Sequence, residues 1–138
     1  MIDFKRIFLD TSPIIYYIEG NEEYFDIVGR LFREHIDSEL FTSTITIAEF
    51  LTKPYRDNRL EYVDAFYGLI DKMDICVAEI SDVIADKAAQ IRAKYDGFKM
   101  MDSIQLAVAS IMECDMFLTN DKQLKRFSEV NVAVIGDL

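Results

Sequence analysis

The sequence predicts an α/β fold in which parallel strands are covered by helices on both faces. Five short apolar segments lack the polar alternation of strands with one exposed face, and longer segments with helical spacing separate them. Only 5 glycines and 2 prolines occur in 138 residues, which is too few for an all-β fold with many tight turns. These features favour a single layered domain over residues 1–138.

The predicted strands are short apolar runs, and the predicted helices fill the intervals between them. The strands comprise residues 7–9, 40–42, 75–78, 116–118 and 132–135. The helices comprise residues 13–19, 22–37, 46–53, 56–71, 81–95 and 99–113. Pro13 is compatible with the first of these helices because proline is tolerated in the first helical turn.

The helix at 81–95 has the strongest pattern. Ser81 is a good capping residue for its start, and Gly97 follows its end. Its apolar side chains share one face: Ile84, Ala88, Ile91 and Tyr95.

The helix at 99–113 shows a second apolar stripe. This stripe consists of Met101, Ile104, Val108 and Ile111. Asp102 and Gln105 lie outside the stripe, and Asp102 falls in the first turn, where the helix dipole favours a carboxylate.

Composition and charge restrict the classes of function. Hydrophobic residues make up 51% of the chain, which is too many for a disordered protein. The 25 acidic and 15 basic residues give a formal net charge of −10, which argues against tight, sequence-independent wrapping of nucleic acid. A nucleic-acid substrate is still compatible with this charge if bound cations bridge carboxylates to phosphate.

We expect a cytoplasmic protein, because no segment has the length and apolarity of a secretory signal or a membrane-spanning helix. Cys76 and Cys114 lie far apart without metal-ligand spacing. We therefore expect both cysteines to be buried and reduced.

Several catalytic plans are excluded by the residue types present. His35 is the only histidine, which excludes histidine-rich zinc sites and nucleases that use two histidines as acid and base. It lies in a charged helical segment, so we expect a solvated helix residue. Neither of the phosphate-loop patterns GxxxxGK[ST] and GxGxxG occurs, so nucleotide binding of those types has no support.

Two aspartates follow predicted strands. Asp10 comes directly after the apolar run that ends at Leu9, and Asp121 comes three positions after the strand at 116–118. The carboxyl ends of parallel strands meet at one edge of a sheet, where α/β proteins gather ligands. We therefore expect Asp10 and Asp121 to share that edge, although either could instead cap the helix that follows it.

Two further acids have apolar neighbours. Glu49 lies in TITIAEFLTK and Asp102 lies in MMDSIQLAVA. Burial of an unpaired carboxylate is costly, so each needs exposure, a cation or a polar cavity. No basic residue occurs near Glu49 before Lys53, which makes a divalent metal the sharper hypothesis. Mg²⁺ and Mn²⁺ prefer oxygen ligands, and either ion can activate water for phosphodiester hydrolysis.

Four segments in chain order resemble the acidic motifs of PIN domains: FLDTSPIIYYIEG, TITIAEFL, MDSIQLAVA and FLTNDKQL. The resemblance covers nearly the whole chain, whose size and layout are most similar to the VapC-type ribonuclease toxins of VapBC toxin–antitoxin pairs. It implies a three-layer α/β/α sandwich with a central parallel sheet. It also implies Mg²⁺- or Mn²⁺-dependent endoribonuclease activity on RNA, a homodimer, and inhibition by a cognate antitoxin protein.

The resemblance assigns roles to two sets of residues in this sequence. The catalytic, metal-binding acids would be Asp10, Glu49, Asp102 and Asp121. Residues that orient water, metal or the acids would be Thr11, Ser12, Thr119 and Asn120. Some relatives carry a further acid where this chain has Gln123, a departure that would leave a second metal weakly held. The segment GFKMM before Asp102 also lacks the proline common in the family.

Basic and aromatic residues near the motifs are candidates for RNA contact. The basic ones are Lys53, Arg56, Arg59, Lys122, Lys125 and Arg126. A solvated surface explains such charged side chains more readily. Tyr16 and Tyr17 could stack on bases, but their helical setting favours packing in the core or in a dimer interface.

Two other classes of function are compatible with these acids. A non-catalytic PIN-like module could bind RNA or protein, although it would have no physical reason to retain four carboxylates. A phosphatase or phosphoacceptor with an aspartate nucleophile needs a second acid beside it, whereas Thr11 and Ser12 follow Asp10.

Overall fold

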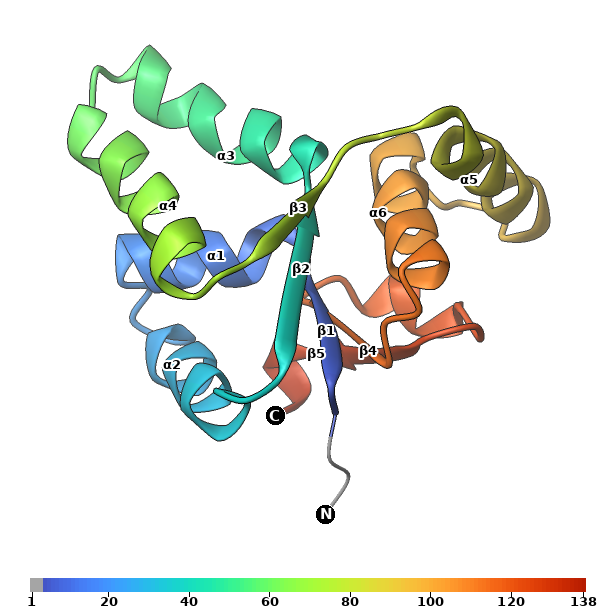
Figure 1. Cartoon of the computed structure of the whole chain (residues 1–138), viewed down its shortest axis with the longest axis horizontal. Coiled ribbons are helices and arrows are strands. Elements are labelled where there is room, and N and C mark those ends of the chain that lie inside the picture. Colours follow the sequence, from blue (N-terminus) through green and yellow to red (C-terminus); the bar gives the residue numbers. More distant parts are fainter. Residues whose placement is uncertain (1–3) are drawn as a thin grey trace.

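Five parallel strands form the central sheet in the computed structural model, which describes residues 4–138 (Figure 1). The strands are β1 (Arg6–Leu9), β2 (Glu39–Ser43), β3 (Cys76–Ala78), β4 (Met116–Thr119) and β5 (Asn131–Val134). Their order across the sheet is β3-β2-β1-β4-β5, and each neighbouring pair is parallel. The chain therefore builds the sheet outward from β1 in one direction and then, beginning with β4, in the other.

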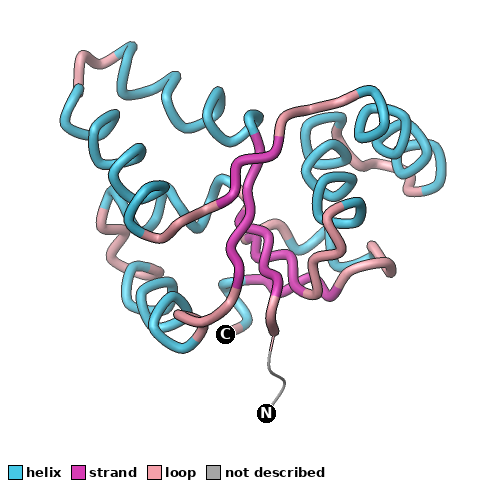
Figure 2. The backbone as a smooth tube through the Cα atoms, in the orientation of Figure 1, coloured by secondary structure: helices cyan, strands magenta, loops and turns pink. Residues whose placement is uncertain are grey.

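Helices cover both faces of this sheet (Figure 2). Within residues 4–138 they are α1 (Thr11–Glu19), α2 (Phe25–Glu34), α3 (Thr44–Arg56), α4 (Leu60–Lys72), α5 (Asp82–Lys94) and α6 (Met100–Ile111). Helices α1 to α4 lie on one side, and α5 and α6 lie on the other (Figure 1). Two short 3₁₀ helices, η1 (Lys122–Arg126) and η2 (Ile135–Asp137), flank β5. The predicted three-layer α/β/α sandwich is confirmed.

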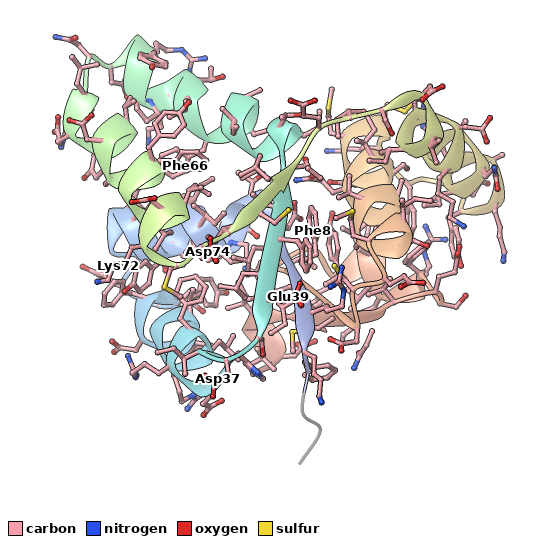
Figure 3. The ribbon with its side chains drawn as sticks, viewed as in Figure 1. Phe8, Asp37, Glu39, Phe66, Lys72 and Asp74 are labelled. Atoms are coloured by element: carbon pink, nitrogen blue, oxygen red, sulfur yellow. The ribbon has the colours of Figure 1, made fainter. Side chains whose placement is uncertain are left out.

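Side-chain alternation along β1 produces an apolar core on each side of the sheet. Phe8 packs in the core beneath α5 and α6, where its ring stacks on Phe117 with 5.1 Å between centroids. Ile7 and Leu9 belong to the opposite core, which they share with Phe66 of α4. Figure 3 shows Phe8 and Phe66 on opposite sides of the sheet. Both faces of β1 are therefore apolar. The polar side chain that follows them, Asp10, lies at the carboxyl end of the strand.

Several helix boundaries differ from the prediction for local reasons. The predicted helix at 22–37 begins later, at Phe25, because the Asn21 side chain accepts hydrogen bonds from two backbone amides and closes a turn before it. It ends before His35, which is half-buried and has its ring 6.2 Å from that of Phe4, so the prediction of a solvated helix residue was wrong. Helix α3 continues through Pro54, which is buried, and does not stop before it.

The apolar stripe predicted for α6 was half right, since Val108 is buried and Ile104 packs against the core, whereas the residues at its two ends are exposed. Met101 and Ile111 are 48% and 41% exposed, whereas Gln105 is only 1% exposed. Helix α6 packs against α5 on one side and against β2 and β4 on the other, so most of its circumference is covered. A single-stripe pattern cannot describe a helix enclosed in this way.

The two cysteines differ in their exposure to solvent. Cys114 is buried as predicted, and its burial raises the pKa of the thiol to about 12. Cys76 is exposed, because β3 is an edge strand of the sheet.

Each helix within residues 4–138 is too short or too polar to cross a bilayer.

Candidate active site

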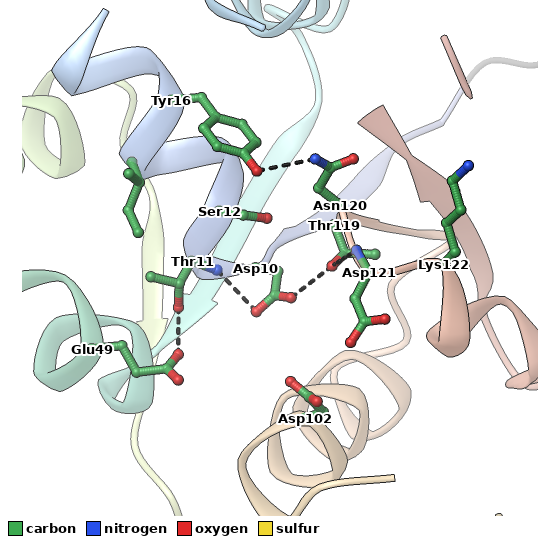
Figure 4. Close-up of a pocket in the computed structure, with 11 residues that line it drawn as sticks. Asp10, Thr11, Ser12, Tyr16, Glu49, Asp102, Thr119, Asn120, Asp121 and Lys122 are labelled. Atoms are coloured by element: carbon green, nitrogen blue, oxygen red, sulfur yellow. Dashed lines mark hydrogen bonds between the residues drawn. The ribbon is translucent and has the colours of Figure 1, made fainter. Parts of the chain in front are cut away.

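A cleft of about 490 Å³ opens where the carboxyl ends of β1 and β4 lie side by side (Figure 4). This is the point at which the strand order reverses, the usual ligand crevice of an open parallel sheet. Both sets of residues predicted from the sequence, the four acids and the four polar residues beside them, line this cleft. The lining residues are Asp10, Thr11, Ser12, Ile15, Tyr16, Glu49, Asp102, Thr119, Asn120, Asp121 and Lys122.

The two strand-end aspartates cap helices and face the cleft at the same time. Asp10 is the N-cap of α1 and accepts a hydrogen bond from the backbone amide of Thr11 at 2.9 Å. Asp121 is the N-cap of η1 and accepts from the amide of Gln123 at 3.0 Å. Capping, the alternative considered for each residue, is therefore compatible with a place in the cleft.

The other two acids reach the cleft from helices on opposite sides of the sheet. Glu49, on α3, is exposed and accepts a hydrogen bond of 2.6 Å from the hydroxyl of Thr11. Asp102 lies in the first turn of α6 and is half-buried. Figure 4 shows Asp10, Asp102 and Asp121 pointing toward one another, with Glu49 beside Thr11.

Burial gives Asp10 an unusual titration. Only 9% of Asp10 is exposed, and this desolvation raises its pKa from 3.8 to about 6, although hydrogen bonds from Thr119 and Thr11 oppose the shift. The charges of Asp102 and Glu49 raise it further. Desolvation also raises the pKa of Asp102, and the Asp121 and Glu49 charges add to this effect. The cleft thus holds carboxylates that disfavour one another's ionisation.

No cation within residues 4–138 forms an ion pair with any of the four acids. Lys122 is the basic residue on the cleft wall, and its nearest carboxylate partner is Asp137, at 3.8 Å. Within residues 4–138 the four acids therefore outnumber the basic groups near them, which are Lys122 on the cleft wall and Lys99, whose charge partly offsets the rise in the pKa of Asp102.

Hydrogen bonds hold the strand-end loops in place around the cleft. The Thr119 hydroxyl donates to the Asp10 carboxylate at 2.8 Å and accepts from the Asp121 amide at 3.2 Å. The Asn120 side chain donates to the Tyr16 hydroxyl at 3.0 Å and accepts from the Gly136 amide at 2.9 Å. These bonds connect the ends of β1 and β4 to α1 and to the C-terminal η2.

Comparison with known proteins identifies the family of this fold. The family model described as PIN domain matches residues 7–130. The chain belongs to the PIN domain family. The match confirms the resemblance carried by the four acidic motifs. A sequence search of curated proteins gives no significant match.

Solved structures similar to this PIN domain include proteins of toxin–antitoxin systems. A chain in the complex of VapBC2 from Rickettsia felis with promoter DNA aligns at a TM-score of 0.73 and 14% identity, covering 94% of this chain and 98% of that one. VapC20 from Mycobacterium tuberculosis, a toxin that cleaves the sarcin-ricin loop, aligns at 0.73 and 18%, covering 91% and 98%. A chain of FitAcB from Neisseria gonorrhoeae aligns at 0.71 and 19%, covering 96% and 99%. At these identities the likeness establishes the shared fold.

Two buried polar residues beside the cleft of this PIN domain were missed in the sequence. Gln105 of α6 donates hydrogen bonds to Asp10, at 3.4 Å, and to Thr46 of α3, at 2.7 Å. The signal for Gln105 was its spacing, since it follows Asp102 by one helical turn. Thr46 was assigned only as the start of a helix, although it lies one turn before Glu49.

Of the basic and aromatic residues predicted as candidates for RNA contact, some line the cleft and others make contacts elsewhere. Lys122 and Tyr16 line it. Arg59 pairs instead with Glu61, and Lys125 pairs with Asp137. Tyr17 is partly buried and packs on the rings of Phe25 and Phe32, which agrees with the predicted packing role.

The donor set fits a hard divalent cation such as Mg²⁺ or Mn²⁺. The four acids supply carboxylate oxygens, and the buried Ser12 hydroxyl at the cleft wall has no hydrogen-bond partner in the structure. Over residues 4–138 no three acidic, histidine or cysteine side chains stand close enough together to hold an ion as they are placed.

Replacement of Asp10 by asparagine should stabilise the metal-free protein at neutral pH. Because the folded-state pKa of about 6 exceeds 3.8, stability is highest when Asp10 is protonated and is lost as the pH rises through about 6. In EDTA at pH 7, Asp10→Asn should raise the free energy of unfolding by about 1 to 3 kcal/mol, and the gain should shrink below about 1 kcal/mol at pH 4.

Urea unfolding at the two pH values measures this difference. Asp64→Asn is the matched control, because Asp64 is an exposed acid of α4. If Asp10→Asn were less stable than the wild type at pH 7, the claim that the ionised Asp10 carboxylate destabilises the folded protein would be wrong.

Proposed function

We propose that this PIN domain is a divalent-metal-dependent endoribonuclease and the toxin of a type II toxin–antitoxin pair. The observation that carries the proposal is the meeting of four carboxylates, from four separate segments of the chain, at one cleft where none of them forms an ion pair within residues 4–138. A folded protein keeps such a repulsive cluster at low cost only when a cation shares it. Phosphodiester hydrolysis is a reaction that uses the charge of such a cation.

Asp10, Glu49, Asp102 and Asp121 would hold Mg²⁺ or Mn²⁺. When bound, the ion supplies an activated water and neutralises charge on the phosphate and the leaving oxygen. Thr119 holds the Asp10 carboxylate, and Thr11 holds that of Glu49. Lys122, at the edge of the cleft, is placed to attract a phosphate of the substrate.

The structural relatives support RNA as the substrate and an antitoxin as the partner. VapC20 cleaves the sarcin-ricin loop, and the Rickettsia felis protein was solved as a VapBC complex. The cleft wall includes Tyr16 and Asn120, an aromatic ring and an amide of the kinds that stack on or hydrogen-bond to unpaired RNA bases. We extend the proposal to a homodimer that acts in the cytoplasm, where both an RNA substrate and an antitoxin are present.

RNA cleavage should depend on a divalent metal and on the acids of the cleft. With Mg²⁺ or Mn²⁺, the wild type should cleave total RNA or isolated ribosomal stem-loops, and EDTA should abolish the reaction. Asp10→Asn and Asp102→Asn should each lower the cleavage rate by about 100-fold or more, because each removes a carboxylate of the cluster. Gel analysis of end-labelled RNA measures these rates.

The control for the cleavage experiment is Asp64→Asn, which should keep the wild-type rate. Retention of half or more of the activity in Asp10→Asn or Asp102→Asn would contradict the site assignment. Metal binding without cleavage of any RNA would instead favour the non-catalytic PIN-like module that binds RNA or protein.

An antitoxin partner should be encoded beside this gene. Coexpression with the adjacent small reading frame should yield a complex that copurifies through gel filtration, and equimolar partner should suppress RNA cleavage. A neighbouring protein that neither copurifies nor inhibits would argue for a nuclease that works outside a toxin–antitoxin pair.

A further inference from the structure

A buried polar cluster lies beneath the acid cleft, between the sheet and helices α3 and α6. Its members have at most 1% of their surface exposed: Thr42, Ser43, Thr46 and Gln105. Gln105 interrupts a stretch of α6 in which the other buried residues are mostly apolar. An apolar side chain would be the less costly occupant of such a position, because every buried polar group needs a partner.

Hydrogen bonds fix the orientation of the Gln105 amide. The Ser43 hydroxyl donates to the Gln105 side-chain oxygen, while Ser43 Oγ itself accepts from the amide of Ile45 at the start of α3. The amide nitrogen of Gln105 therefore faces the other way, and its two hydrogens are directed to Thr46 Oγ1 and Asp10 Oδ1. Gln105 is a donor aimed at the most buried acid of the cleft.

The remaining hydroxyls have one consistent arrangement of donors and acceptors. Thr42 Oγ1 lies 2.8 Å from the Leu9 carbonyl, which can only accept, so the Thr42 proton points there. Thr46, which accepts from Gln105, then donates to Thr42 at 2.8 Å. The Thr46 hydroxyl also lies 3.3 Å from that of Thr11, which donates to Glu49.

We infer that Gln105, oriented by Ser43 and Thr46, is a positioning residue that sets the Asp10 carboxylate for metal-dependent cleavage. The cluster also abuts Thr11, so it supports the hydrogen bond that holds Glu49 on the far side of the cleft. This inference rests on the proposed function. Its physical basis is that a charged group held by aligned, buried donors needs little reorganisation when it takes up a ligand.

Substitutions that remove the donors but keep the volume test this role. Gln105→Met deletes the amide, and Thr46→Val replaces the hydroxyl by a methyl group of similar shape. Each should weaken Mn²⁺ binding by about 10- to 100-fold and lower kcat for RNA by a similar factor, with KM changed by less than about 3-fold. Thr46→Ser, which restores the hydroxyl, should bring both values back to within about 3-fold of wild type.

The matched control is Gln90→Met, because Gln90 also donates its amide to an aspartate, Asp86, but does so on the exposed surface of α5. It should keep the wild-type Mn²⁺ affinity and kcat. Calorimetry gives the Mn²⁺ dissociation constant without reference to activity, and thermal melting in EDTA shows whether each variant is folded. If Gln105→Met does not fold, the comparison of Thr46→Val with Thr46→Ser tests the positioning role in its place.

The possible results separate this inference from the proposed function. A wild type that neither binds Mn²⁺ nor cleaves RNA overturns both. A wild type that does both, while Gln105→Met and Thr46→Val keep Mn²⁺ affinity and kcat within 2-fold, overturns the positioning role alone. Equal loss in Thr46→Val and Thr46→Ser also overturns it, because the hydroxyl would then not be the group that matters.

Discussion

The buried carboxylate of Asp10 is the constraint around which the rest of the site is arranged. Only 9% of the residue is exposed, its pKa is raised to about 6, and no basic side chain compensates its charge within the part of the chain that the structure describes. Its place follows from topology, since β1 is the central strand and Asp10 is the first residue beyond it. A group so costly to ionise points to a ligand that offsets the cost.

The two apolar cores and the polar rim have complementary roles. Phe8 and Ile7 fill opposite sides of β1, so the central strand is held rigidly by both layers of helices. A rigid strand fixes where its carboxyl end lies, and hydrogen bonds from Thr119 and Gln105 then fix the orientation of Asp10. Helices α3 and α6 add Glu49 and Asp102 from opposite faces. The cleft therefore depends on both cores at once.

Much of this arrangement could be predicted from sequence because it follows from simple patterns. Unbroken apolar runs indicated a parallel sheet, and the rule for its carboxyl edge brought Asp10 and Asp121 together. Glu49 and Asp102 were noticeable because acids among apolar neighbours need compensation. Their roles as metal ligands are part of the proposal, whereas their meeting at one cleft is a feature of the fold.

The errors arose where tertiary contacts override local pattern. Helix α6 is covered on two sides, so a single stripe misassigned Met101 as buried and gave no reason to regard Gln105 as buried. Cys76 was expected inside because the order of strands, which makes β3 an edge, cannot be read from one sequence. Pro54 within α3 shows that packing can outweigh the usual helix-ending effect of proline.

The most direct measurement of the central claim is the location of bound metal. Crystals grown or soaked with Mn²⁺ should give an anomalous difference peak within the cleft bounded by Asp10, Glu49, Asp102 and Asp121. The same peak should be absent from crystals that contain Mg²⁺ in place of Mn²⁺. A cleft without a peak at saturating Mn²⁺, or a peak only elsewhere on the protein, would contradict the account.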